Sequence, residues 1–264
     1  MGAEGGAAMQ RKVEAISRQL SGALAAWPEV QAVVLGEAAE SGVLDPYFAI
    51  PLDVYHRGEL PAGAERRARF GSPAAFEAVP GQLQDRFLLG ELPVRVRYQE
   101  AGRFEELLGR IEACHWVFHD SSPGLFYRLA HGQPLFVRSA WLEECRKRLL
   151  GLPEHYWTVL LEGSQRAFSY ALTDMQASSL RDDALFFNLS LAHFLRATAS
   201  FLFALNRRFE PGPRLVSRHL VGLERLPDGF AGRFESLLRE GPELDRGRKC
   251  EIAGLLARSA LAMV

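Results

Sequence analysis

Five charged residues in the first hundred positions could bind a metal ion or an anion. Glu37, Asp45 and Asp53 lie in or beside two short apolar stretches, and carboxylate oxygens are the ligands that Mg²⁺ prefers. Arg95 and Arg97 lie two positions apart further along the chain. Guanidinium groups bind phosphate or carboxylate directly. The sequence is therefore compatible with two ways of binding an anion. One uses a metal ion held by the carboxylates, and the other uses the arginine side chains directly.

Two predicted strands must position the acids. The β-branched run Gln31–Leu35 is typical of a central strand, and Gly36 ends it. Ala49–Tyr55 is predicted to be the second strand. Side chains alternate along a strand, so Pro51 and Asp53 share one face. This layout predicts a site between the two strands, where a short polar connection joins them.

A predicted hairpin positions the two arginines. Asp85–Leu89 and Leu92–Tyr98 are apolar runs that turn at Gly90. In the second run, apolar side chains alternate with Arg95 and Arg97. One face of this strand is therefore apolar, and the other face carries both guanidinium groups.

The remaining segments are predicted to be mainly helical, and the order of elements predicts an α+β protein. Residues 1–133 should form a mixed sheet with flanking helices, and residues 134–264 an all-α helical bundle. Within the first part, residues 58–80 are expected to be a loop with at most one helical turn, Trp116–Phe118 a strand, and Asp120–Gly124 a turn. A long helix is expected from Ala184 to about Asn206, with Asp182 or Asp183 as its N-cap and a central place in the bundle.

Composition restricts the classes of function. The chain is 48% hydrophobic and 24% charged with a net charge of −1, which is typical of a folded protein without a strong nucleic-acid signal. Three scattered cysteines predict a cytoplasmic protein without disulfide bonds. No membrane association is expected, because the apolar run Ala184–Leu205 contains Asn188, His193 and Arg196. A protein partner could bind an exposed helical face.

The order of elements resembles the nucleotidyltransferase fold of the DNA polymerase beta superfamily. A strand that ends in glycine, a connection of about a dozen residues, a second strand, a hairpin strand and a helical bundle follow one another in both. The stretch FLFALNRRFEPGPRLVSRHLVGLERLP, Phe201–Pro227, is similar to a C-terminal segment of bacterial nucleotidyltransferase-like proteins, in which an LNRRY-P element ends the long helix. The resemblance covers most of the chain and is weakest in the catalytic motif.

The resemblance implies a metal-dependent site from which this sequence departs. The family uses a Gly-Ser turn for phosphates, two carboxylates at alternate strand positions and a third on a neighbouring strand, which together hold two Mg²⁺ ions. Gly36 matches the turn, but Glu37 replaces the serine. The paired strand positions are Ala49 and Pro51, and the one acid on that face is Asp53. The polar face of the candidate third strand carries the two arginines instead of an acid.

Three hypotheses follow. In the first, the metal triad has been lost, and Gly36, Arg95 and Arg97 bind a nucleotide or another phosphorylated ligand beside Asp53, without a cofactor, in a regulatory protein. In the second, an active nucleotidyltransferase uses Glu37, Asp45 and Asp53 as catalytic residues, with Mg²⁺ held by Asp45 and Asp53. In the third, the chain is a protein-interaction module without a small-molecule ligand. Separately from these hypotheses, a purely structural alternative for Asp53 is a solvated strand residue or one that forms a salt bridge with Arg95 or Arg97 across the sheet.

Overall fold

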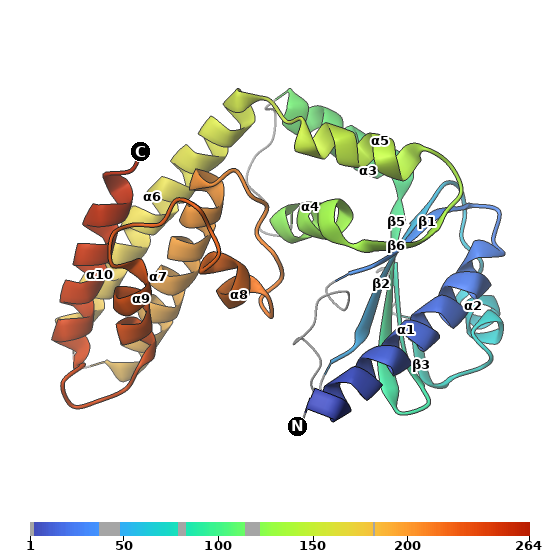
Figure 1. Ribbon diagram of the computed structural model, residues 1–264, viewed down its shortest axis with the longest axis horizontal. Helices are drawn as coiled ribbons and strands as arrows, with labels where there is room; N and C mark the ends of the chain where they lie inside the picture. Colours follow the sequence, from blue (N-terminus) through green and yellow to red (C-terminus); the bar gives the residue numbers. More distant parts are fainter. Residues whose placement is uncertain (1–2, 37–47, 79–82, 114–121, 182) are drawn as a thin grey trace. The chain divides into compact units, whose positions relative to one another are not determined.

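The computed structural model describes residues 3–36, 48–78, 83–113, 122–181 and 183–264, and these form two compact units. The first unit comprises Met1–Trp116 and Gly124–Leu152, and the second comprises Val117–Pro123 and Pro153–Val264. Figure 1 shows a sheet with helices in the first unit and helices alone in the second. This arrangement confirms the predicted α+β class, a mixed sheet with flanking helices followed by a helical region.

The first unit contains six strands and five helices within the described ranges. In chain order these are α1 (Ala3–Ala25), β1 (Val30–Leu35), β2 (Ile50–His56), α2 (Gly63–Arg69), β3 (Ala74–Ala78), β4 (Gln84–Leu89), β5 (Leu92–Glu100), α3 (Ala101–Glu112), α4 (Ser122–His131), β6 (Gln133–Val137) and α5 (Trp141–Leu150). The strand order is β3-β4-β5-β2-β1-β6, with β2 and β5 parallel and every other neighbouring pair antiparallel. β2 is therefore a central strand, which agrees with its nearly continuous burial.

Helices pack on both faces of the sheet. α1 contacts β1, β2 and β6 on one face, where Trp27 packs against Phe70 and Tyr98 (Figure 1). On the other face, the ring of Tyr55 lies 5.9 Å from that of Phe104 in α3 and 4.9 Å from that of Trp141 in α5. Because successive strand residues point to opposite faces, Tyr55 and Asp53 both lie on the side of α3 and α5.

Several local predictions for the first unit were wrong. The predicted boundary at residue 133 falls before β6, but β6 pairs with β1 and α5 packs beside α3, so both remain in the first unit. The stretch 58–80, expected to be a loop with at most one helical turn, contains the seven-residue helix α2 and the strand β3. The predicted turn at Asp120–Gly124 overlaps the first residues of α4. Edge and short elements such as these bury few side chains, so they leave a weak periodic signal. The predicted strand Trp116–Phe118 lies outside the described residues.

The second unit is a helical bundle built on its longest apolar helix. Its helices are α6 (Glu154–Ser179), α7 (Ala184–Leu205), α8 (Val216–Leu220), α9 (Phe230–Leu238) and α10 (Arg246–Leu261). Asp183, one of the two predicted N-caps, caps α7 by accepting from the backbone N–H of Phe186 at 2.9 Å. By length and composition alone α7 could also cross a membrane. In this structure it supplies much of the core, including Phe194 and Phe201, which stack on Phe168 of α6.

The segment after α7 is fixed by one side chain. Asn206 donates to the carbonyl oxygens of Leu202 at 2.8 Å and of Arg225 at 2.9 Å, and accepts from the backbone N–H of Arg225 at 2.8 Å. Arg225 in turn donates to the carbonyl oxygens of Leu205 and Met263, near the ends of α7 and α10. These bonds satisfy carbonyl groups that a helix end leaves without partners.

Replacing Asn206 with alanine should therefore destabilise the second unit. Three hydrogen bonds are lost at a partly exposed position, so we expect the free energy of unfolding to fall by about 1–3 kcal/mol. Chemical denaturation followed by far-UV circular dichroism measures this change. Asn188→Ala, at an exposed position on α7, is the matched control and should change stability by less than about 0.5 kcal/mol. Equal effects of the two substitutions would contradict the role assigned to Asn206.

Candidate functional site

Asp53 is a fully buried carboxylate held by two arginines from different elements. Nε of Arg97 lies 2.8 Å from Oδ1, and Nη2 of Arg97 donates to Oδ2 at 3.3 Å. Nε of Arg128 donates to Oδ2 at 3.0 Å. The Nε–Oδ1 contact is close but poorly aligned for a hydrogen bond, so it acts as an ion pair. One negative charge thus faces two positive charges, and the cluster is net positive.

The sheet register explains the contact with Arg97. In the parallel pair β2–β5, Asp53 lies opposite Arg97, and in the antiparallel pair β1–β2 it lies opposite Val34. Residues that are opposite one another share a face of the sheet. The side chains of Asp53 and Arg97 therefore contact one another directly. This contact is one of the salt bridges that the sequence suggested for Asp53.

Arg128 reaches the same carboxylate because α4 ends against β1. A side chain at Gly132, directly after α4, would overlap Val34 and the backbone oxygen of Arg128, so only glycine allows this close approach. Gly36 also lies against the side chain of Arg128: a Cβ atom at this glycine would be 3.4 Å from Cδ of Arg128. Sequence reasoning missed Arg128, since it assigned the preceding residues to a turn and had no pattern that linked α4 to β2.

The donor set around Asp53 does not fit a divalent cation. Both carboxylate oxygens already contact guanidinium groups, and a Mg²⁺ ion at 2.0–2.1 Å from an oxygen would have to displace them. Over the described ranges, no three His, Cys, Asp or Glu residues come together as a possible metal site. Glu37 and Asp45, the other predicted catalytic and metal-binding residues, lie outside those ranges.

The predicted phosphate-binding residues lie on the same sheet face as Asp53 or beside it. Gly36 continues β1, and its N–H donates to the carbonyl oxygen of Pro51 at 3.0 Å. Arg95 is exposed and lies opposite Pro51 on β5, one strand repeat from Arg97. Arg97 itself is only 21% exposed because it contacts Asp53. The structure thus brings Arg95, Arg97 and Asp53 to one face of the sheet. Arg128, which the sequence did not predict, joins them there from α4.

A second buried carboxylate occupies the opposite face. Asp85 is fully buried and accepts from Nε and Nη2 of Arg66 at 2.8 and 2.7 Å, and from the hydroxyl of Tyr98 at 2.8 Å. The guanidinium of Arg66 also lies 5.1 Å from the centre of the Tyr98 ring. Burial and the nearby Asp85 carboxylate raise the pKa of Tyr98 well above its ordinary value, so the phenol stays a donor. This cluster fixes α2 to the sheet and offers no open position for a ligand.

Buried polar groups also line the helix-covered side next to Asp53. The hydroxyl of Tyr55 and Nε1 of Trp141 are buried and have no partner within the described structure. Burial, and secondly the charge of Asp53, raise the pKa of Tyr55 well above its ordinary value. Burial likewise raises the pKa of the Cys145 thiol to about 12, so this cysteine is not a thiolate nucleophile at neutral pH.

The last residue of β2, His56, should make stability depend on pH. It is 4% exposed, Nδ1 lies 3.0 Å from the carbonyl oxygen of Gly58, and burial lowers its pKa. Below a pH of about 6.5 the unfolded chain binds a proton that the folded chain does not. The contribution of His56 to the free energy of unfolding should therefore be constant above that pH. It should fall as the pH decreases towards the folded-state pKa of this residue.

Denaturation of the wild type and of His56→Asn at pH 7.5 and 5.5 tests this prediction. The asparagine amide keeps a donor for Gly58 and removes the titrating group. We expect the loss of stability between the two pH values to be smaller in the variant. An equal loss in both proteins would show that His56 does not contribute.

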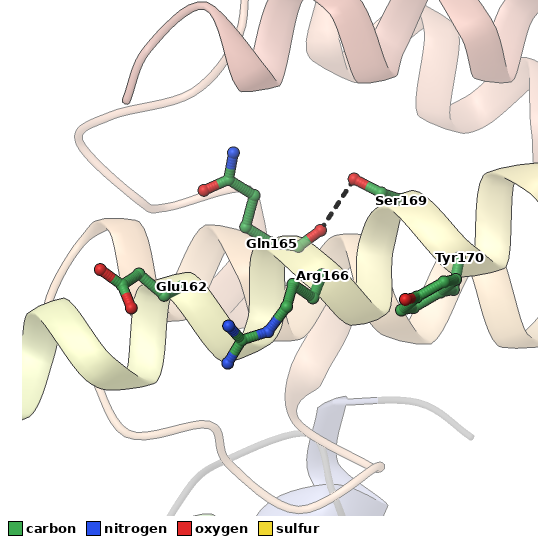
Figure 2. Close-up of a pocket in the computed structure, with 5 residues that line it drawn as sticks. All are labelled: Glu162, Gln165, Arg166, Ser169 and Tyr170. Atoms are coloured by element: carbon green, nitrogen blue, oxygen red, sulfur yellow. Dashed lines mark hydrogen bonds between the residues drawn. The ribbon is translucent and has the colours of Figure 1, made fainter.

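A polar stripe on α6 is another surface feature of the described residues. Figure 2 shows that its five residues lie along one side of the helix, and the hydroxyl of Ser169 donates to the carbonyl oxygen of Gln165 at 3.0 Å. The stripe lines a shallow hollow and consists of Glu162, Gln165, Arg166, Ser169 and Tyr170. All of these residues come from one helix, and they follow the i, i+3, i+4 spacing of an ordinary solvated face.

Comparisons with known proteins give a partial similarity to a solved structure. No family model matches the chain, and no curated protein does. Among solved structures, the chain is similar to a nucleotidyltransferase-like protein from Exiguobacterium sibiricum 255-15, with 15% sequence identity and a TM-score of 0.47. The similarity covers 96% of this chain and 74% of the other.

Proposed function

We propose that this chain is a nucleotidyltransferase-like protein that binds a nucleotide or another phosphorylated anion without metal-dependent catalysis, and that it acts as a regulatory protein. The observation that supports the proposal is the ion cluster at Asp53. The acid available on the predicted metal-binding strand is fully buried and neutralised by Arg97 and Arg128. A carboxylate in this state cannot hold Mg²⁺ without breaking two ion pairs.

The same cluster favours binding of an anion. One carboxylate balances one of the two guanidinium groups and leaves an excess positive charge at the cluster. Arg95 lies at the next position of the same face. Arginine presents a planar fork of donors that matches phosphate oxygens, and its partial burial strengthens the attraction. Arg97 and Arg128 remain 21% and 15% exposed, so a ligand can reach them from solvent.

Calorimetric titration with ATP and GTP, each with excess EDTA or with Mg²⁺, tests the proposal. Binding should occur without metal, and Arg95→Gln should weaken it about tenfold or more because a charge-assisted contact is lost. Arg97→Lys keeps a positive charge beside Asp53 but removes the planar fork, and it should also weaken binding. Arg11→Gln, in the exposed part of α1, is the control and should bind as the wild type does.

Other outcomes would support the rival hypotheses. Binding that requires Mg²⁺, together with release of pyrophosphate from the nucleotide, would indicate an active nucleotidyltransferase that uses Glu37 and Asp45. Absence of binding to either nucleotide under both conditions would overturn the proposal and favour a protein-interaction module.

A further inference from the structure

The imidazole of His56 has one buried nitrogen atom without a partner. Nδ1 lies 3.0 Å from the carbonyl oxygen of Gly58. A carbonyl oxygen only accepts, so Nδ1 carries the proton of the neutral ring and Nε2 is an acceptor. Within the described structure, Nε2 is buried and forms no hydrogen bond. A proton that binds Nε2 would therefore create a buried donor, which is costly until it finds an acceptor.

A carboxylate lies opposite this imidazole in the sheet. The parallel register of β2 and β5 places Glu100 opposite His56, and opposite residues share a face. Burial lowers the pKa of His56, and the Glu100 carboxylate acts against this shift. Donation from the N–H groups of Arg103 and Gly102 lowers the pKa of Glu100, and the nearby imidazole lowers it further. Glu100 is therefore still ionised when His56 binds a proton.

The other charges around His56 act more weakly or have partners of their own. Glu29, which precedes β1, also raises the pKa of His56, but less than the carboxylate on β5 does. The buried face of α1 carries serine and apolar side chains. The remaining titratable groups at this end of the sheet are paired: Arg57 with Glu105 of α3, Arg138 with the carbonyl oxygen of Val30, and Tyr98 of β5 with Asp85.

Glu100 also caps α3. Its carboxylate accepts from the backbone N–H of Gly102 at 3.0 Å and of Arg103 at 2.6 Å. A Cβ atom at Gly102 would lie 3.1 and 3.2 Å from the two carboxylate oxygens, so glycine leaves room for this cap. Loss of an N-cap shifts the equilibrium of a helix end by only about fivefold. The carboxylate can therefore leave the helix at a moderate cost.

We propose that His56 and Glu100 form a pH-sensitive switch, in which a proton on Nε2 draws the Glu100 carboxylate from the N-terminus of α3 to the imidazolium and loosens the first turn of α3. A hydrogen bond between two charged groups is stronger than the neutral ones it replaces, so the transfer is favoured. Phe104, in the first turn, packs against Tyr55 on the face of Asp53. The switch thus acts on a helix that covers this face, and it does not depend on anion binding.

NMR titration of the histidine side chains of the full chain tests the pairing. The signal of His56 is identified by its absence in His56→Asn. Glu100→Gln removes the charge and keeps an oxygen that can cap α3, and it should lower the proton affinity of His56 about fivefold or more. Glu29→Gln should lower this affinity less than twofold, because its carboxylate acts more weakly on the ring.

Two glycine substitutions in α3 test the transfer itself. Gly102→Ala displaces the carboxylate from the helix before the ring is protonated, so it should raise the proton affinity of His56 by up to about fivefold. Gly109→Ala is the matched control in the same helix. A Cβ atom there meets no atom of the described structure within 4 Å, and the proton affinity should stay unchanged.

Amide exchange at pH 7.5 and 5.5 measures the loosening of α3. After correction for the intrinsic pH dependence of exchange, protection of residues 101–104 should fall at the lower pH by up to about fivefold. His56→Asn should abolish this fall. The amides of Leu108 and Ile111, buried in the second half of α3, report opening of the whole helix and serve as the internal reference.

Three results would overturn the switch. The first is an unchanged proton affinity of His56 in Glu100→Gln, or a larger effect of Glu29→Gln. The second is an equal effect of Gly102→Ala and Gly109→Ala. The third is a loss of protection in the first turn that persists in His56→Asn. None of these measurements uses a nucleotide, so a failure of the proposed anion binding leaves the switch unaffected, and the reverse also holds.

Discussion

Replacing Asp53 with asparagine should lower the free energy of unfolding by about 3–5 kcal/mol, one of the two largest effects expected in this protein. The substitution preserves size and removes the charge that holds Arg97 and Arg128, so two mostly buried guanidinium groups lose their counterion. Breaking a buried ion pair by removing one partner has a cost of this size, because desolvation of the remaining charge is no longer offset. The loss is a large part of a typical domain's stability. Urea denaturation followed by tryptophan fluorescence measures it.

The same experiment separates a structural carboxylate from a metal ligand. Measurements in EDTA and in Mg²⁺ should give the same stability for the wild type, since a metal that bound the native protein would stabilise it. Asp174→Asn, at an exposed position on α6, is the matched control and should change stability by less than about 0.5 kcal/mol. A stable Asp53→Asn variant, or stabilisation by Mg²⁺ that this variant abolishes, would contradict the assignment of Asp53 to an ion cluster.

The arginine on β5 could be predicted from the sequence, and the one on α4 could not. Alternation of apolar and basic residues placed Arg95 and Arg97 on one strand face, and the same period placed Asp53 on β2. To predict that these side chains contact one another, only the pairing of β2 with β5 had to be known in addition. Arg128 joins them from α4, across a distance in sequence that no local pattern spans. The close contact at Gly132 that directs α4 over Asp53 depends on the packed sheet, so it has no signal in a single sequence.

Many other arginines of the chain have structural partners, which explains why counting basic residues says little about ligands. Arg138 donates to the carbonyl oxygens of Ala25 and Trp27 at the end of α1, and Arg146 donates to those of Leu129 and Gly132 at the end of α4. Arg225 serves the ends of α7 and α10 in the same way. A cation near a helix C-terminus also interacts favourably with the helix dipole. An anion site must therefore be argued from arginines that share a face with an excess of positive charge.

The second large effect is expected from Asp85→Asn, which should release α2 from the sheet and lower the free energy of unfolding by about 3 kcal/mol or more. α2 buries no residue of its own. The side chain that anchors it is Arg66, which is 12% exposed and forms two short contacts with the fully buried Asp85. Without the carboxylate charge, the guanidinium has a neutral partner in a desolvated position.

Detachment of α2 can be measured separately from global unfolding. Amide hydrogen exchange in Gly63–Arg69 should accelerate by about 100-fold or more in the variant, because a change of 1.4 kcal/mol corresponds to a factor of ten. Glu65→Gln is the control within the same helix: its contact with Arg69 spans 3.6 Å between exposed side chains and should contribute less than about 1 kcal/mol. Unchanged exchange in α2, or equal acceleration by the control, would contradict the anchoring role.

Asp85 and Asp53 lie on opposite faces of one sheet and are both paired with arginine, yet only the Asp53 cluster carries excess charge that solvent can reach. Asp53→Asn removes the negative charge that competes with an anion for Arg97 and Arg128. Tighter anion binding by this variant in its folded state, with unchanged binding in Asp85→Asn, would thus assign the ligand to the face of Asp53.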